Sequence, residues 1–249
     1  TPNHSMGAFK EPHGGTLIDL YLSESAAEEE KTRAMDFKSW DLTDRQQCDI
    51  DLILNGAFSP LDGFLNQPDY QAVLSDMRLS SGVLWPIPIN LDVTEEFAES
   101  LETGEWIALR DGEGVMVATM KIEDIWTVDK EAEAEAVFKC NLEEHPGVDY
   151  LLNHANNVYL GGRLQGVEPP VHYDYRLLRD SPSELRGRFR KLGWRKVVAF
   201  QTRNPMHRAH YELTFRAARQ HEANLLIHPV VGLTKKGDVD HFTRVRCYE

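Results

Sequence analysis

A strand, a polar turn and a helix are predicted in immediate succession near the C-terminal end of this sequence. Residues 197–200 (Val-Val-Ala-Phe) form an apolar run typical of a short buried strand, and the polar segment Gln201–His210 follows it. Ala209, Leu213 and Ala217 then recur every four residues, which predicts a helix with one apolar face. Because the first N–H groups of a helix have no partner within it, such a turn can bind an anion.

The side chains of this polar segment are hydrogen-bond donors. Gln201 and Asn204 carry neutral amides, and Arg203 carries a planar guanidinium that fits a tetrahedral oxyanion with two parallel hydrogen bonds. His207 and His210 are three residues apart, so they are expected on one helix face. No acidic residue interrupts the segment, which indicates a site for a negatively charged ligand.

The sequence Gln-Thr-Arg-Asn-Pro-Met-His-Arg-Ala-His at Gln201–His210 resembles the signature of the ATP sulfurylases (sulfate adenylyltransferases). Its His-x-x-His core is shared more loosely among nucleotidylyltransferases. The resemblance extends over His228–His241, Pro12–Gly15 and Asn55–Leu65, and therefore covers nearly the whole chain. The aromatic residues of Asn55–Leu65 are expected to fill a core or an interface.

The resemblance implies that sulfate and ATP react to give adenylyl sulfate (APS) and pyrophosphate, or the reverse. Sulfate is already ionised, so the site needs to bring two anions together and stabilise the charge of departing pyrophosphate. This accounts for the absence of a carboxylate or a Ser or Cys nucleophile from the motif. Magnesium is expected to arrive with ATP, and no metal site of the protein's own is expected.

The resemblance also implies the role of each residue in the segment. The residues implied to bind sulfate are Gln201 and Arg203. The residues implied to bind ATP are Gln201, Thr202, Arg203, Asn204, His207 and His210. The residues implied to be catalytic are Thr202, Arg203, Asn204, His207 and His210. By spacing alone, His207 and His210 could also be half of a metal site. Lys235 and Lys236 could be a solvated pair or could approach the phosphates.

Charge is distributed unevenly along the chain. The net charge is −13, yet the residues from Arg190 onward hold 12 Lys and Arg against 5 Asp and Glu. The basic residues are scattered rather than massed in a stripe, which favours a small polyanion such as a nucleotide over nucleic acid. No stretch has the ~20 apolar residues of a membrane span, and the three cysteines have no metal-binding or disulfide spacing. We expect a cytoplasmic protein with neither nucleic-acid nor membrane partners.

An antiparallel β unit is predicted in the first half of the chain. Leu84–Ile89, Trp106–Leu109 and Val115–Met120 are rich in strand-forming residues, and Asp111–Gly114 predicts a hairpin between the last two runs. The family resemblance implies that this unit is a β-barrel similar to the PUA domains of RNA-modifying proteins.

Four helices are predicted around this β unit, one of them a short helix at Tyr70–Met77. Asp41–Leu54 has Thr43 as its N-cap and is expected to bury Cys48, Leu52 and Ile53. Glu24–Lys31 is expected to be an acidic helix on a solvated face, and Lys130–Lys139 is a second acidic helical stretch.

A domain boundary is predicted near Glu168–Pro170, which gives an N-terminal domain of residues 1–170 and a second domain of residues 171–249. A capping box at Ser181–Glu184 starts the first helix of the second domain. Leu225–Val231 is its second strand, so the two polar loops, Gln201–His210 and Gly232–His241, are expected to leave from the carboxyl ends of parallel strands. The expected fold is an α+β domain with a PUA-like β-barrel, followed by the first part of an α/β nucleotidylyltransferase (Rossmann-like) parallel-sheet domain.

The second domain is expected to be truncated, because the catalytic domain of the family continues beyond these two strands with a further Gly-Arg-Asp-His-type loop. The full-length family is implied to form homo-oligomers. Two alternatives stay open: a nucleotidylyltransferase with a different acceptor, or a non-catalytic remnant that binds nucleotide or RNA.

Overall fold

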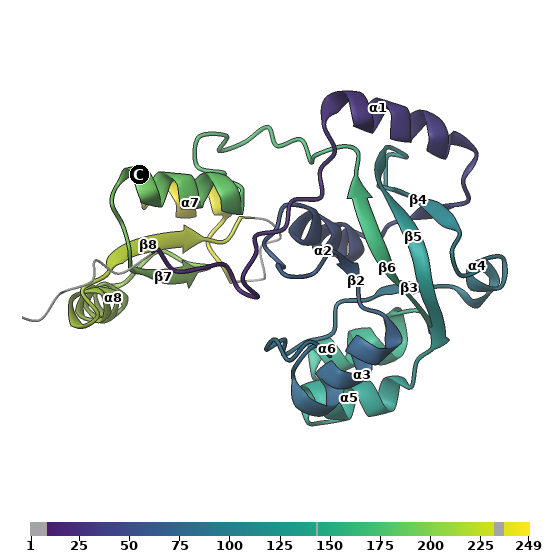
Figure 1. Ribbon diagram of the computed structural model, residues 1–249. Coiled ribbons are helices and arrows are strands. Elements are labelled where there is room, and N and C mark those ends of the chain that lie inside the picture. Colours follow the sequence, from purple (N-terminus) through teal and green to yellow (C-terminus); the bar gives the residue numbers. More distant parts are fainter. Residues whose placement is uncertain (1–8, 143, 232–236) are drawn as a thin grey trace, which may run out of the picture. The chain divides into compact units, whose positions relative to one another are not determined.

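The computed structural model describes residues 9–142, 144–231 and 237–249 (Figure 1). The chain forms two compact units. The N-terminal unit is Pro12–Ser183, and the C-terminal unit is Glu184–Glu249 together with residues 9–11. In the described part of the chain, no helix has both the length and the apolar composition required to cross a membrane.

The N-terminal unit is built on one six-stranded sheet of described residues. Its strands, in spatial order, are β1 (Ser39–Asp41), β4 (Trp106–Arg110), β5 (Met116–Thr127), β6 (Val158–Gly166) and β2 (Gly63–Phe64), with β3 (Leu91–Val93) also paired to β6. Only β1 and β4 run parallel, and the other pairs are antiparallel. The expected barrel is not confirmed, because no described pairing joins the two ends of this order.

The run Leu84–Ile89, expected to be a strand, makes only an isolated bridge between Leu84 and Arg78 in the structure. Pro86 and Pro88 are the physical reason, since neither has an N–H group to donate to a ladder. The prediction of a strand there is wrong. The hairpin at Asp111–Gly114 is confirmed, because β4 and β5 pair antiparallel across it.

Strand β6 is the longest of the strands that the sequence patterns did not indicate. Gly161 and Gly162 interrupt its apolar residues and suggest a loop, yet the strand pairs with β5 on one side and with β2 and β3 on the other. A Cβ atom on Gly162 would lie 1.9 Å from the carbonyl oxygen of Lys121, and one on Gly63 would lie 1.9 Å from that of Gly162. These glycines therefore allow three strands to approach closely.

The helices around the sheet are α1 (Glu24–Arg33), α2 (Asp44–Leu54), α3 (Gln67–Asp76), α4 (Glu95–Glu99), α5 (Lys130–Phe138) and α6 (Pro146–Asp149). A short 3-10 turn spans Ala34–Asp36, and a π-helical turn spans Tyr150–His154.

Helix α2 shows how the sequence determines a buried face. Thr43 caps it, as expected, and the structure adds a reciprocal capping box with Gln46. The helix buries Ile50, Ile53 and Leu54, but Cys48 is exposed, so the prediction that it faces inward is wrong. Positions two apart on a helix are separated by about 200°, which places residue 48 opposite residues 46 and 50.

Helix α1 is less solvated than expected. Glu30 is buried, and its carboxylate accepts hydrogen bonds from the Arg33 guanidinium and, at 2.7 Å, from the Thr119 hydroxyl of β5. The hydrogen bond from Arg33 is the largest influence on Glu30 and lowers its pKa. Elsewhere in this unit, Leu61 and Phe64 lie in the core, as expected for the segment Asn55–Leu65.

The C-terminal unit is a strand–helix–strand unit with two further helices. Strands β7 (Val197–Thr202) and β8 (Asn224–Pro229) are parallel and in register, which confirms the predicted α/β pairing. The helices are α7 (Pro182–Lys191), α8 (Arg208–Gln220) and α9 (His241–Arg246). Helix α8 buries Thr214, whereas Leu213 on its predicted apolar face is 61% exposed in this chain.

Candidate functional site

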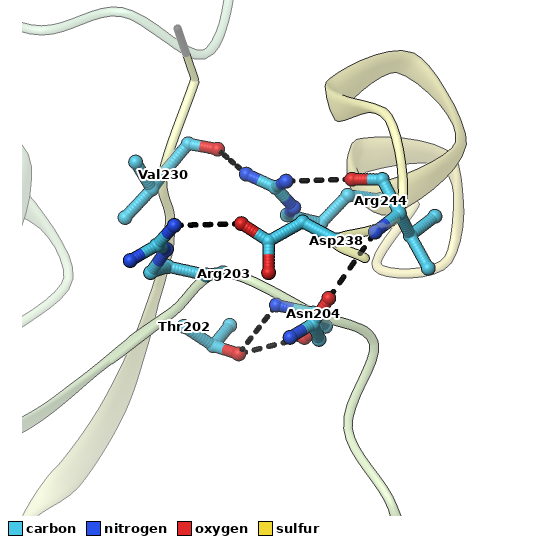
Figure 2. Close-up of polar contacts among 7 residues, drawn as sticks. Thr202, Arg203, Asn204, Val230, Asp238 and Arg244 are labelled. Carbon is cyan, nitrogen blue, oxygen red and sulfur yellow. Dashed lines mark hydrogen bonds and ion pairs between the residues drawn. The ribbon is translucent and has the colours of Figure 1, made fainter. Parts of the chain in front are cut away.

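The polar segment Gln201–His210 is divided among a strand, a loop and a helix. Gln201 and Thr202 are the last residues of β7, and α8 begins at Arg208. The Thr202 hydroxyl donates to the carbonyl oxygen of Asn204 at 2.6 Å and accepts from the Asn204 N–H at 3.3 Å (Figure 2). This local pair of bonds turns the chain sharply as it leaves the sheet.

Parallel pairing brings the next loop to the same edge of the sheet. Gln201 is opposite His228, Thr202 is opposite Pro229, and the N–H of Val230 donates to the carbonyl oxygen of Thr202 at 2.8 Å. The two polar loops therefore leave from adjacent carboxyl ends, as the sequence predicted, which is where ligands of open α/β sheets bind.

An acidic side chain from the second loop reaches Arg203. The Asp238 carboxylate accepts a hydrogen bond from one terminal nitrogen of the Arg203 guanidinium at 2.6 Å. The segment Gln201–His210 contains no acid of its own, and the sequence patterns did not indicate this pairing. The available signal was the position of Asp238 within His228–His241, which shares the family resemblance.

Asn204 joins the two loops and the end of the chain. Its side-chain oxygen accepts from the N–H of Val239 at 3.3 Å, and its carbonyl oxygen accepts from the Tyr248 hydroxyl at 2.9 Å. These contacts give Asn204 a clear role in holding the backbone of the site.

Arg244 of α9 is buried and holds the second loop at both ends. Its guanidinium donates to the carbonyl oxygen of Val230, which precedes the loop, and to that of Val239, near the end of the loop, the latter at 2.6 Å. Asp240 caps the same helix by accepting from the N–H of Thr243 at 3.0 Å. That backbone hydrogen bond, followed by the one from the Thr243 hydroxyl, lowers the pKa of Asp240.

The two histidines lie at the start of α8. His207 is the N-cap residue in an extended conformation rather than part of the helix, and His210 is in the first turn. Their rings stack with centroids 4.5 Å apart, and the His210 ring also contacts Phe200 of β7 at 5.7 Å. The Nδ1 atom of His210 is buried and has no hydrogen-bond partner among the described residues.

The N-terminus of α8 is electrostatically suited to an anion. Its first turn contains no acidic residue, and the His207 side chain makes no capping hydrogen bond. The first backbone N–H groups of the helix thus keep their capacity to donate to a ligand at its positive end.

The structure brings Thr202, Arg203 and Asn204 together with the second loop, and it brings His207 and His210 together with each other. The Gln201 side chain is exposed at the end of β7. Lys235 and Lys236 lie outside the described residues. In the described ranges, no cluster of three or more His, Cys, Asp and Glu side chains has an arrangement that could hold a metal ion.

Comparison with known proteins gives two family matches. A sequence profile of the PUA-like domain matches residues 10–169, and one of the ATP-sulfurylase family matches residues 176–249.

Individual relatives match along most of this chain. The sulfate adenylyltransferase of Eremothecium gossypii is 53% identical over 242 residues, which are 96% of this chain and 48% of that protein. The one from Schizosaccharomyces pombe is 58% identical over 211 residues, 84% of this chain and 43% of that protein. A solved structure described as a hexameric APS kinase from Thiobacillus denitrificans has a TM-score of 0.75 at 36% identity, covering 96% of this chain and 43% of its own. The chain spans about half the length of the curated relatives it matches.

Proposed function

This chain belongs to the ATP-sulfurylase family, and from that premise we propose that it carries part of a sulfate adenylyltransferase site. The proposed reaction joins sulfate and ATP to give adenylyl sulfate and pyrophosphate, or runs in reverse. One arrangement carries the proposal: Arg203, at the carboxyl end of β7, is followed after a short loop by a helix N-terminus without acidic residues or a side-chain cap.

The proposed roles follow the donors of this segment. Gln201 and Arg203 bind sulfate, and the backbone and side chains from Gln201 to Asn204 line the phosphates of ATP. His207 and His210 donate to the phosphates. The catalytic residues are proposed to be Thr202, Arg203, Asn204, His207 and His210.

The chemistry needs donors and alignment rather than a base. A sulfate oxygen attacks the α-phosphorus of ATP, and the bond from that phosphorus to the oxygen of the β-phosphate breaks. No proton leaves sulfate, and the negative charge that develops on pyrophosphate is stabilised by guanidinium, imidazole and backbone N–H donors. Removing one such donor costs about 3 kcal/mol in comparable sites. Magnesium enters with ATP as part of the substrate.

The two family matches support a domain division near residue 170, since one ends at residue 169 and the other begins at residue 176. We propose residues 1–170 as the PUA-like domain and residues 171–249 as the first part of a Rossmann-like catalytic domain. The likeness to a protein described as hexameric supports a homo-oligomer for the full-length protein.

Binding measurements separate this proposal from the RNA-binding alternative. Residues 1–189 hold 35 Asp and Glu against 15 Lys and Arg, a balance that disfavours contact with a phosphate backbone. Isothermal titration should detect a magnesium-bound, non-hydrolysable ATP analogue and no structured RNA, and Arg203→Ala should weaken the nucleotide signal. RNA binding without nucleotide binding would contradict the proposal. Pyrophosphate release from ATP that ignores sulfate would favour a different acceptor.

A further inference from the structure

The ion pair between Arg203 and Asp238 is a single contact between one nitrogen and one oxygen. The NH2 nitrogen of Arg203 lies 2.6 Å from Oδ2 of Asp238, and the two side chains are 41% and 17% exposed. A guanidinium has five N–H donors in a rigid fork. A two-bonded pairing would cover one whole edge of that fork, whereas this contact leaves most of its donors available to a ligand.

The carboxylate of Asp238 is held in position by its own loop. The next residue, Val239, donates its N–H to Asn204 and accepts from Arg244 through its carbonyl oxygen. Arg244 also donates to Val230 at the other end of the loop (Figure 2). The backbone next to Asp238 is thus tied to both the first loop and α9, which limits how far the carboxylate can move.

We propose that Asp238 is a positioning residue that orients the Arg203 guanidinium before an oxyanion binds. The inference deepens the proposed function and rests on it, because Arg203 is there assigned to sulfate. A carboxylate 2.6 Å from the guanidinium restricts its rotamers, so less conformational entropy is lost when the ligand binds.

The direction of the effect separates positioning from simple electrostatics. Asp238 carries a negative charge beside an anion site, so its charge alone weakens sulfate binding. Removal of a carboxylate that acted only through its charge, or that occupied the place of sulfate, would tighten binding. Removal of a positioning carboxylate weakens it.

The test uses the 249-residue chain, three variants for comparison and a fourth, Arg203→Lys, for signal assignment. Asp238→Ala removes the contact, and Asp238→Asn keeps the size and an acceptor oxygen. Asp240→Asn is the matched control, since it removes one negative charge two residues away while Asn still caps α9. The first readout is the NMR order parameter of the Arg203 Nε–H bond without ligand, assigned with Arg203→Lys. The second is the dissociation constant of sodium sulfate, measured against sodium chloride of equal ionic strength.

We expect an ordered Arg203 side chain in the parent chain and in Asp240→Asn, a mobile one in Asp238→Ala, and intermediate order in Asp238→Asn. Sulfate binding should weaken about tenfold in Asp238→Ala, on the scale of a charged hydrogen bond, and less in Asp238→Asn. Unchanged order of Arg203 in both Asp238 variants, or tighter sulfate binding, would overturn the inference while leaving the proposed function intact. A third outcome is that Arg203 loses order in Asp238→Ala, but neither the parent chain nor any variant binds sulfate. That outcome would support the positioning contact and refute the proposed function.

Discussion

The imidazole rings of His207 and His210 stack 4.5 Å apart, with their planes 26° from parallel, across the first turn of α8. His207 is at the N-cap, and the Nδ1 atom of His210 is buried without a partner in the described part of the chain. Two imidazole rings therefore lie side by side at the positive end of the helix, where a phosphate is stabilised.

The first prediction concerns these two histidines. His207→Ala and His210→Ala should each weaken binding of the magnesium-bound ATP analogue about tenfold, the scale of one hydrogen bond to a charged group. Replacement by Asn, which keeps a donor, should cost less. Titration calorimetry measures both effects. Elemental analysis should find no stoichiometric zinc, and one zinc per chain that both variants lose would instead assign the pair to a metal site.

Arg203 should not tolerate replacement by lysine. An ammonium cannot reproduce the planar fork that donates two hydrogen bonds to an oxyanion and a further one to Asp238. In a fusion of this chain to the C-terminal remainder of a full-length relative, we expect Arg203→Lys and Arg203→Ala to lower sulfate-dependent turnover by about 10²–10³, the scale for loss of one donor to developing charge. Steady-state rates at varied sulfate measure this, and near-normal sulfate dependence in the lysine variant would refute it.

Arg244 should stabilise the C-terminal unit. Arg244→Met leaves the carbonyl oxygens of Val230 and Val239 without their buried donor, which should lower the free energy of unfolding by about 3 kcal/mol. The NMR signal of the Trp194 indole N–H, followed through a urea titration, reports on this unit. Arg246→Met is the exposed control and should change stability by less than about 0.5 kcal/mol. Equal effects of the two variants would contradict this role for Arg244.

Local signals in the sequence predicted the elements whose determinants are local. Thr43 and Gln46 close a capping box within four residues, and the hairpin at Asp111–Gly114 follows from its turn residues. Strand β6 was missed because of Gly161 and Gly162, which suggest a loop. Glycine is required at both positions because backbone from other parts of the chain approaches closely, and no local pattern encodes that approach.

The candidate site shows the same division. The donors from Gln201 to His210 and the edge of the sheet where they lie were predictable from the strand–turn–helix pattern. The contact between Arg203 and Asp238 joins residues 35 apart in the chain, and the burial of Arg244 depends on carbonyl groups of a different loop. Such contacts depend on tertiary structure rather than on spacing.

Asp51 of α2 should make the N-terminal unit sensitive to pH. Burial raises the pKa of Asp51 to about 6, so the folded state holds this proton more tightly than the unfolded state does. The stability from the neutral carboxyl is fully present below about pH 4, the unfolded pKa, and is lost as pH rises through about 6.

Asp51→Asn, which cannot ionise, should therefore match the parent chain at pH 4 and exceed it by about 1 kcal/mol at pH 7, after allowance for partial exposure. Thermal unfolding at the two pH values measures the difference. Asp36→Asn, at an exposed position, is the control for the loss of one acidic side chain. A stabilisation by Asp51→Asn that is equal at both pH values would exclude ionisation as its cause.

Sulfate-dependent release of pyrophosphate tests the assignment of Gln201–His210 to sulfate adenylyl transfer most directly. Because this chain spans about half the length of its curated relatives, the assay compares the chain alone with its fusion to the C-terminal remainder of the Saccharomyces cerevisiae relative, which is 51% identical over 241 residues. We predict little or no release by the chain alone, release that requires sulfate in the fusion, and release lowered by about 10²–10³ in the fusion with Arg203→Ala. Release in the folded fusion that is independent of sulfate, or unaffected by Arg203→Ala, would contradict the assignment.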